Sequence, residues 1–348
     1  MNGEFIQALN EIEKERGINK DILLEAIEAA LISAYKRNYG TSQNVKVSID
    51  RMTGDVKVYA VKTVTEDVED DFLQISLEEA REINRNYDIG NFVETEVTPR
   101  SFGRIAAQTA KQVVVQRIRE AERGVIYEEY IEKENEVLTA IVQRVEKKNV
   151  YVELGRTEGL LTASEQIPTE KYQVNDRIKV YVLEVKKTTK GPQVLVSRTH
   201  PGLVKRLFEL EVPEIHSGIV QVKNIAREAG FRTKMSVHSV DESVDPVGSC
   251  VGQKGIRVEK IVEELKGEKI DIIKWSQDPV EYIGNALSPA KVIMVQVNEE
   301  EKAAKVIVPD NQLSLAIGKE GQNARLAAKL TGWKIDIKSQ SQSQEVLE

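Results

Sequence analysis

The chain has 348 residues, of which 41% are hydrophobic and 30% are charged, and its formal net charge is −7. This length allows roughly two to four compact domains with buried cores. The sequence has no apolar run of membrane-spanning length, no secretion signal at its start and one cysteine, Cys250, so we expect a cytoplasmic protein without disulfides or membrane contact.

Residues 1–133 contain most of the acidic excess and read as an α+β domain that ends in a long connecting helix. Apolar residues recur at helical spacing near the start, and residues 44–64 alternate like two strands around a turn. Ser76 has the character of a helix N-cap. In chain order we expect helices at 5–12 and 22–30, strands within 44–64, a helix after Ser76, a strand at 91–97 and a helix from about Ser101 to about Lys133.

Residues 134–200 change to short strands separated by glycine and proline turns. Five short strands in so small a unit indicate an OB-type barrel. The segment from Ala163 to Tyr172 is expected to be its short helical connection. The strands are expected at 137–145, 149–154, 159–162, 177–185 and 193–197.

An internal repeat follows. The segment GQKGIRVEKIVEELKGEKIDI, from Gly252, aligns with GKEGQNARLAAKLTGWKIDI, from Gly318, with one residue missing from the second copy. Each copy reads as two strands, a helix, a glycine turn, a helix and a strand. This pattern predicts two tandem units, 201–276 and 277–340, before a polar tail, 341–348, which we expect to lack fixed structure.

The glycine turns have a physical use. A helix N-terminus carries unpaired backbone N–H groups and a partial positive charge, and glycine removes the Cβ that would block a phosphate from approaching. Helix, Gly-x-x-Gly and helix between strands is how a KH module clamps the backbone of about four nucleotides. The turns Gly252, Gln253, Lys254, Gly255 and Gly318, Lys319, Glu320, Gly321 are therefore candidate RNA clamps.

The alternative is that these glycines only end helices. Two copies in matched contexts favour the clamps, although the carboxylate of Glu320 would repel a phosphate unless it points to solvent or caps the next helix. Enzyme motifs fit less well, because no triphosphate-binding loop, dinucleotide fingerprint or zinc-ligand spacing is present. Cys250 and His238 form a conceivable nucleophile pair, but a buried Cys250 is the simpler interpretation. We expect no cofactor and no metal.

The barrel is a second candidate RNA surface, because OB folds bind single strands with basic residues and stacked aromatic rings. Tyr151 either stacks on a base or fills the barrel, and the basic residues either bind RNA or only keep the hairpins soluble. The candidates are Arg144, Lys147, Lys148, Tyr151, Arg156, Lys186 and Lys187.

The segment GLLTASEQIP in the barrel, the order of barrel and two KH units, and IGKEGQNARLAAKLTGWKIDI together closely resemble the NusA family of bacterial transcription elongation, termination and antitermination factors. The resemblance covers nearly the whole chain. It implies an N-terminal α+β domain, an S1-like OB barrel and two tandem KH domains of type II order. It also extends the clamps to Ile256 and Arg257 in the first, and to Gln322, Asn323 and Arg325 in the second.

The resemblance implies that residues 1–133 bind RNA polymerase near the RNA exit channel. The barrel and KH units would contact nascent single-stranded RNA and, with other antitermination factors, modulate pausing, termination and antitermination. On the long helix, Arg104, Lys111 and Arg117 would meet polymerase, unless they form an ordinary charged face. We expect a monomer without catalysis. An RNA-processing nuclease or a ribosome-assembly factor with the same modules are the competing hypotheses.

Overall fold

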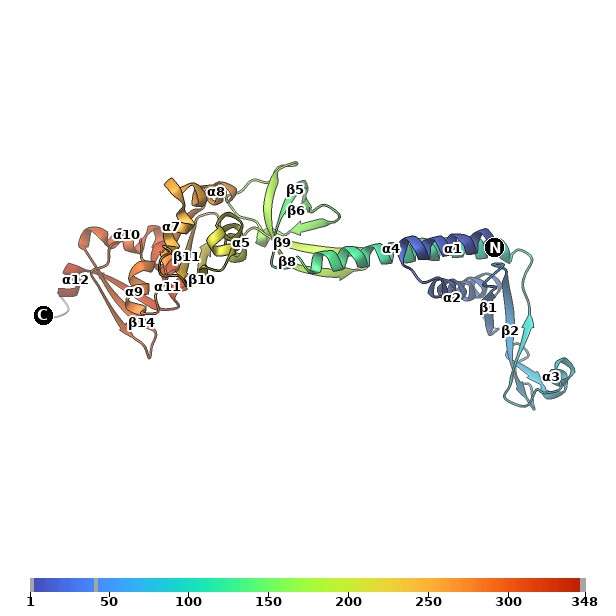
Figure 1. Ribbon diagram of the computed structural model, residues 1–348. Coiled ribbons are helices and arrows are strands. Elements are labelled where there is room, and N and C mark those ends of the chain that lie inside the picture. The colour runs from blue at the N-terminus through green and yellow to red at the C-terminus, as the bar shows by residue number, and fades with distance from the viewer. Residues whose placement is uncertain (1–2, 41–42, 345–348) are drawn as a thin grey trace. The chain divides into compact units, whose positions relative to one another are not determined.

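The computed structural model describes residues 3–40 and 43–344. Residues up to Val125 form one compact unit and residues from Ile126 onward form another, and helix α4 (Phe102–Ile131) contains residues of both (Figure 1). Within the described residues, no helix has the length and apolar character needed to cross a bilayer.

The helices of the first unit share one core. Helix α2 (Lys20–Tyr39) begins after Asn19, whose side chain accepts hydrogen bonds from two N–H groups of the first turn. Its apolar face packs against α1 (Gly3–Arg16) and the first half of α4. The buried residues of this core include Leu9, Leu23, Leu24, Ile27, Leu31, Phe102 and Ala106. The two expected N-terminal helices and the long helix are therefore present.

The sheet of the first unit centres on strand β2 (Val56–Thr65). Strands β1 (Val45–Ile49) and β4 (Phe92–Glu96) pair with it antiparallel, and the short β3 (Gln74–Ser76) pairs with it parallel. Helix α3 (Leu77–Ile83) follows β3 directly, because the Ser76 hydroxyl accepts the Glu79 N–H as an N-cap. The hairpin, the short helix and the later strand match the sequence expectations.

The second unit begins with a closed five-stranded barrel in the order β5-β6-β7-β9-β8. The strands are β5 (Val137–Glu146), β6 (Asn149–Glu153), β7 (Glu158–Leu161), β8 (Arg177–Thr188) and β9 (Gly191–Ser197). Valines from these strands fill the interior. The helical connection expected from Ala163 to Tyr172 is wrong beyond a single 3-10 turn at Ala163–Glu165. Pro168 has no N–H and restricts the preceding residue to extended conformations, so a helix does not continue there.

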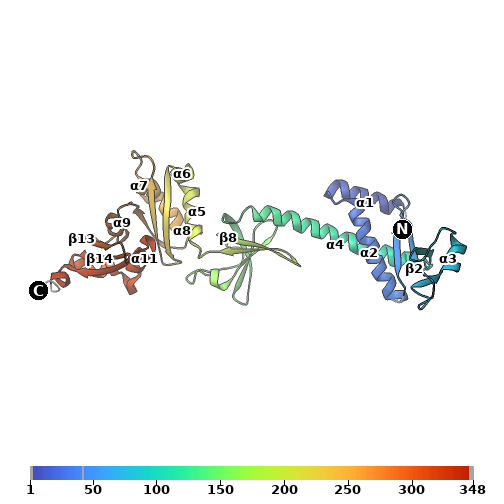
Figure 2. The same ribbon diagram turned by 90° about the horizontal axis from the view of Figure 1, so that it is seen from below.

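The first glycine turn lies in an α/β unit after the barrel. Strand β10 (Val220–Glu228) pairs antiparallel with β11 (Arg232–Ser239), which pairs parallel with β12 (Lys269–Lys274). Helices α5 (Pro201–Glu211), α7 (Pro246–Val251) and α8 (Ile256–Glu264) cover one face of this sheet, and α6 (Pro213–His216) packs beside them (Figure 2). This is the order expected for a type II KH unit.

The second copy repeats this arrangement. Its strands are β13 (Met294–Asn298), β14 (Ala303–Val308) and β15 (Lys334–Ser339), and its helices are α9 (Pro279–Ala286), α10 (Leu313–Ile317) and α11 (Gln322–Thr331). The polar tail is helical at its start, as α12 (Gln340–Gln344), which contradicts the expectation of no structure there. Ser339 and Gln342 form a reciprocal capping box, and Ser341 donates to Asp310. The expected tail from residue 345 onward lies outside the described residues.

The two KH units share a core. Helix α11 of the second KH unit contacts β10 and β11 of the first KH unit. Ala226 and Ile273 of the first KH unit join the apolar core of the second KH unit. The Tyr282 hydroxyl, 5% exposed as a residue, donates to Ser236 Oγ at 2.9 Å. The sheet of the first KH unit is thus covered by its own helices on one face and by the second KH unit on the other.

Candidate nucleic-acid interface

The two glycine turns have the same backbone conformation. Gly252 and Gly318 lie at φ 76° with ψ 173° and 171°, and the third residue of each turn, Lys254 or Glu320, lies at φ 51°. Gly255 and Gly321, at φ 81° and 74°, then open α8 and α11. The sequence repeat is therefore a structural repeat down to single dihedral angles.

The first glycine of each turn is required by close packing as well as by its positive φ. A Cβ on Gly252 would lie 2.8 Å from Arg257 Cγ, and one on Gly318 would lie 2.8 Å from the Asn323 backbone nitrogen. The second glycines have more room, because nothing lies within 4 Å of a Cβ on Gly255 and the nearest atom to one on Gly321 is Arg325 Nη1, at 4.0 Å. Each turn is thus closed on its inner side and open on its outer side.

Each turn presents two backbone N–H groups outward. Gln253 and Lys254 begin one short 3-10 turn, and Lys319 and Glu320 begin the other, so helix geometry leaves their N–H groups without a partner inside the turn, whereas both glycines of each turn donate to backbone carbonyls. The four residues that carry these N–H groups are all exposed. A phosphate oxygen is a suitable acceptor for such a pair of amides at a helix N-terminus.

Apolar side chains lie exposed next to both turns. Ile256 is 53% exposed directly after the first turn, where it borders an open groove together with Val244 and Gln253. Leu315 and Ile317, which precede the second turn, are 43% and 37% exposed. Unpaired bases have apolar faces that can rest on such side chains, whereas the phosphates would lie against the amides.

Arg257 and Asn323, two residues after the second glycine of each turn, support the turns from inside. The Arg257 guanidinium donates to the Ser249 carbonyl at 2.6 Å and to Glu214 at 2.9 Å. The Asn323 amide donates to the carbonyls of Ala316 and Leu287, both at 3.0 Å, and the residue is 1% exposed. Asn323 therefore does not lie on the RNA-facing surface expected from the sequence, because its side chain is used to hold α10 and α9.

Gln322 and Arg325 both contact the other KH unit. Arg325 Nε donates to Glu228 Oε1 at 2.6 Å and Gln322 Nε2 donates to Glu228 Oε2 at 2.9 Å. The hydrogen bond from Arg325, followed by the one from Gln322, overcomes partial burial and holds the pKa of Glu228 below its usual value. Both side chains thus connect the second turn to β10.

On the barrel, the Arg144 guanidinium covers the expected stacking residue. Its Cζ lies 3.9 Å from the centre of the Tyr151 ring, and it forms ion pairs with Glu158 and Glu146. The Glu158 hydrogen bond is the largest contribution that raises the pKa of Arg144. Tyr151 lies between Val150 and Val152 on β6, whose side chains fill the barrel, so its ring lies on the outer surface of the barrel rather than inside it.

The other basic candidates on the barrel are exposed but differ in their contacts. Lys147 and Lys148 occupy the β5–β6 turn at φ 48° and 73°. Arg156 pairs with Glu129 at 3.2 Å and Lys186 pairs with Glu184 at 2.9 Å. Lys187 Nζ lies 4.2 Å from the centre of the Tyr127 ring.

In the first unit, the three candidate polymerase contacts lie exposed on α4. Arg117 pairs with Glu120 at 3.2 Å. Lys111 borders an apolar groove between α1 and α4, which is lined by Phe5, Ala8, Leu9, Ile12, Ala107, Val114 and Val115. Arg104 lies seven residues before Lys111, so both project from the same side of the helix.

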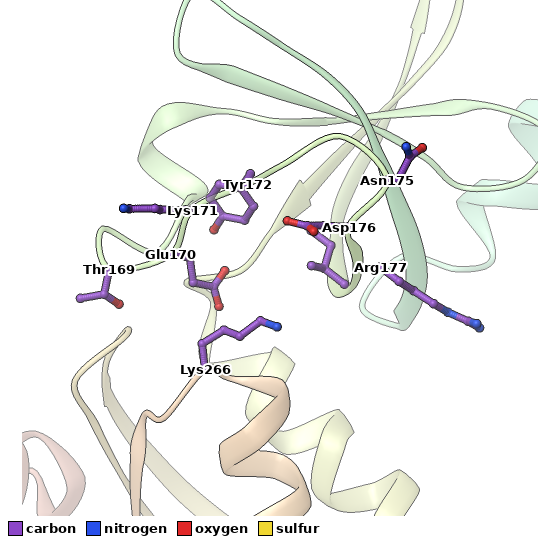
Figure 3. Close-up of a pocket in the computed structure, with 9 residues that line it drawn as sticks. Thr169, Glu170, Lys171, Tyr172, Asn175, Asp176, Arg177 and Lys266 are labelled. Carbon is purple, nitrogen blue, oxygen red and sulfur yellow. The ribbon is translucent and has the colours of Figure 1, made fainter.

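A pocket lies where the barrel meets the first KH unit (Figure 3). Glu170 and Lys266 point into it, whereas Asn175 and Arg177 point away. Beneath it, the fully buried Arg198 binds Glu170 and donates to Glu264 at 3.0 Å and to the Lys179 carbonyl at 2.7 Å. Burial, followed by the Glu170 carboxylate, raises the pKa of Tyr172. These contacts join the two modules.

Comparison with known proteins matches each module. A model of the NusA N-terminal domain matches residues 4–124, and a model of the S1 RNA binding domain matches residues 132–197. Models of the NusA-like first and second KH domains match residues 198–275 and 279–345, so each contains one glycine turn.

Curated relatives match the chain as a whole. The transcription termination/antitermination protein NusA of Halalkalibacterium halodurans is 64% identical over 99% of this chain and 91% of its own. NusA of Bacillus subtilis is also 64% identical, over 99% of this chain and 93% of its own. The chain belongs to the NusA family. NusA of Thermus thermophilus, at 46% identity over 96% of this chain and 89% of its own, agrees with this assignment.

This NusA-family chain is a transcription termination/antitermination protein with S1 and KH RNA-binding domains. Sequence reasoning missed two of its residues near the glycine turns, Glu214 and Glu228, which bind Arg257 and Arg325. No local pattern marks them, because these contacts span 43 and 97 residues of sequence. In the described residues, no group of three or more His, Cys, Asp or Glu side chains is arranged to hold a metal ion.

Proposed function

We propose that this protein binds RNA polymerase through its first unit and grips nascent single-stranded RNA with both glycine turns, and that these contacts modulate pausing, termination and antitermination. The observation that carries the proposal is the pair of matched turns, each of which starts with two exposed residues whose N–H groups have no partner inside the turn. Two such turns in one shared-core assembly suit a continuous strand better than a single small anion.

The physical basis is the same at both turns. Helices α8 and α11 have 9 and 10 residues, so each N-terminus offers a partial positive charge in addition to the amides of the turn. Lys254 and Lys319 add mobile charges. Glu320 reduces the net charge of the second turn, and its exposed side chain is directed away from the core. We therefore expect the second turn to bind phosphate mainly through its backbone.

The barrel would add a weaker contact. Lys147 and Lys148 are exposed at its first hairpin, and Tyr151 offers one ring face because Arg144 occupies the other. A base stacked on that ring would contribute about 1–3 kcal/mol. Linked modules raise one another's local concentration, so each can be weak alone.

The contact with polymerase would use the first unit. Arg104 and Lys111 lie exposed on one side of α4, and Lys111 borders the apolar groove between α1 and α4. A surface that combines positive charge with an apolar groove is suited to an amphipathic segment of a partner protein. We propose that this surface, rather than the RNA-binding modules, holds the protein on polymerase.

We propose that the protein acts by binding and not by catalysis. The nucleophile considered from sequence is unsuited to that role, because burial raises the pKa of the Cys250 thiol to about 12 and the residue is 0% exposed. Its suggested partner, His238, lies instead against the edge of the Trp275 ring, at 5.3 Å between ring centres.

The test replaces the outward residues of both turns in the full chain: Gln253→Asp, Lys254→Asp, Lys319→Asp and Glu320→Asp. Aspartate tolerates the positive φ of the third turn residue and places a carboxylate where phosphate would bind. We expect affinity for a labelled single-stranded RNA to fall at least tenfold, as measured by fluorescence anisotropy. Unchanged affinity would refute the clamps.

The same samples provide the controls. Capture of RNA polymerase by the immobilised variant should equal that of the wild type, since the first unit is untouched. If about six phosphates are contacted, the wild-type log affinity should fall with log salt at a slope near −4. RNA incubated with magnesium should stay at full length, and its shortening would support the nuclease alternative instead.

A further inference from the structure

We propose that Glu228, on strand β10 of the first KH unit, is a positioning residue for the glycine turn of the second KH unit. The proposal rests on the proposed function, because it assumes that the second turn binds RNA. It concerns a side chain that lies outside both turns and outside the unit whose turn it would position.

Glu228 reaches the turn through a short chain of hydrogen bonds. Its two carboxylate oxygens accept from Arg325 Nε at 2.6 Å and from Gln322 Nε2 at 2.9 Å. Arg325 Nη1 then donates to the carbonyl oxygen of Glu320, inside the turn, at 3.1 Å. A guanidinium is suited to this task because its donors have a fixed planar geometry.

Holding this carbonyl orients the neighbouring amide that would meet the phosphate. Glu320 has a positive φ of 51°, a conformation that is costly for a residue with a side chain. Its carbonyl orientation sets its ψ angle, which fixes how the Glu320 N–H lies relative to the start of α11. The cation of Arg325 also offsets the Glu320 carboxylate, and Glu228 followed by Glu320 raises the pKa of Arg325.

The first glycine turn has no arginine at the position that corresponds to Arg325. The position that corresponds to Arg325, four residues after the second glycine, is Glu259, which is exposed on α8. Arg257 braces the first turn within its own unit, through the Ser249 carbonyl and Glu214. The first turn is therefore supported by its own unit, whereas the second depends on a carboxylate supplied by its neighbour.

A competing role for Glu228 predicts the opposite change in RNA affinity when its charge is removed. If the carboxylate merely occupied Arg325 and kept it from RNA, removing its charge would free the guanidinium to bind phosphate and would tighten RNA binding. A positioning role requires that the same change weaken binding and disorder the turn.

The experiment compares Glu228→Gln with Glu259→Gln in the full chain. Both remove one negative charge beside a glycine turn, but only Glu228 contacts Arg325. For Glu228→Gln we expect about three- to tenfold weaker binding of single-stranded RNA, and shifted amide resonances of Lys319, Glu320 and Gly321 in RNA-free protein. For Glu259→Gln we expect no loss of affinity. Equal or tighter binding by Glu228→Gln would overturn the proposal.

A charge exchange separates positioning from simple attachment of the two units. The double variant Glu228→Arg with Arg325→Glu restores an ion pair between the units, but a glutamate cannot donate to the Glu320 carbonyl. We expect the melting temperature to recover while RNA affinity stays reduced. Recovery of both would show that the pair only joins the units. If turn resonances shift but the turn aspartate variants described above bind RNA normally, the proposed function fails while the brace remains.

Discussion

At the scale of single residues, the same sequence position can serve the two turns with different chemistry. Arg257 and Asn323 both follow the second glycine by two residues, and both donate to a carbonyl of the helix before the turn. Their side chains resemble RNA-binding residues in sequence. Burial decides the role of Asn323, and burial depends on residues such as Leu287 that are distant in the chain.

Gly230 shows how a single residue controls the junction between barrel and first KH unit. It lies at φ +81°, and an added Cβ would approach Ile167 Cγ2 to 2.4 Å and Thr169 Oγ1 to 2.5 Å. Gly218 has nearly the same φ, +80°, but nothing lies within 4 Å of its Cβ position. Comparing an alanine substitution at Gly230 with one at Gly218 therefore separates the cost of steric overlap from the cost of backbone strain.

We predict that Gly230→Ala lowers the free energy of unfolding by about 2–4 kcal/mol, whereas Gly218→Ala lowers it by about 1–2 kcal/mol. Calorimetry of the full chain would report this difference in the transition that includes barrel and first KH unit. Equal losses in both variants would mean that the barrel loop moves aside without cost and that the junction is not closely packed.

At the scale of elements, sequence periodicity located most helices and strands, because each buries one face against its own unit. Alternation at 44–64 became β1 and β2, and the helical spacing near the N-terminus became α1 and α2. Predictions from the sequence failed at two places, where a proline or a helix-capping pair overrode what the surrounding residues indicated. Pro168 stopped the expected barrel helix, and the capping box of Ser339 and Gln342 made a helix from a polar stretch.

A buried ion pair between Arg227 and Glu268 stabilises the sheet of the first KH unit. Glu268, 0% exposed, accepts from Arg227 at 2.8 Å through both oxygens, from Thr233 at 2.6 Å and from the Gly230 N–H at 2.8 Å. Burial alone would raise the pKa of Glu268, but the hydrogen bonds from Arg227 and the other donors outweigh it and lower the pKa.

Because the folded state lowers this pKa, the stabilisation is present above the ordinary glutamate pKa of about 4.3 and is lost as pH falls through the folded value. We predict that Glu268→Gln destabilises the protein at neutral pH, since it leaves Arg227 partly unpaired, and makes stability less dependent on pH below about 4.3. Urea unfolding across that range would measure it, with the exposed Glu263→Gln as control. An unchanged acid slope in Glu268→Gln would contradict the assignment.

At the scale of the whole molecule, the order of modules could be read from sequence, but the contacts between modules could not. The repeat indicated two tandem KH units. The shared core of Ala226, Ile273 and Tyr282, and the bond from Arg325 to Glu228, depend on tertiary packing that no local pattern reveals. The second glycine turn is therefore supported by the first KH unit only when the two KH units are packed together.

The central claim, that both turns grip one RNA backbone through their outward amides, is tested most directly by amide NMR of the full chain titrated with single-stranded RNA. We predict that the amide resonances of Gln253, Lys254, Lys319 and Glu320 shift together along one binding curve. The account would be contradicted if RNA bound and shifted barrel resonances, such as that of Tyr151, while the amides of both turns stayed in place.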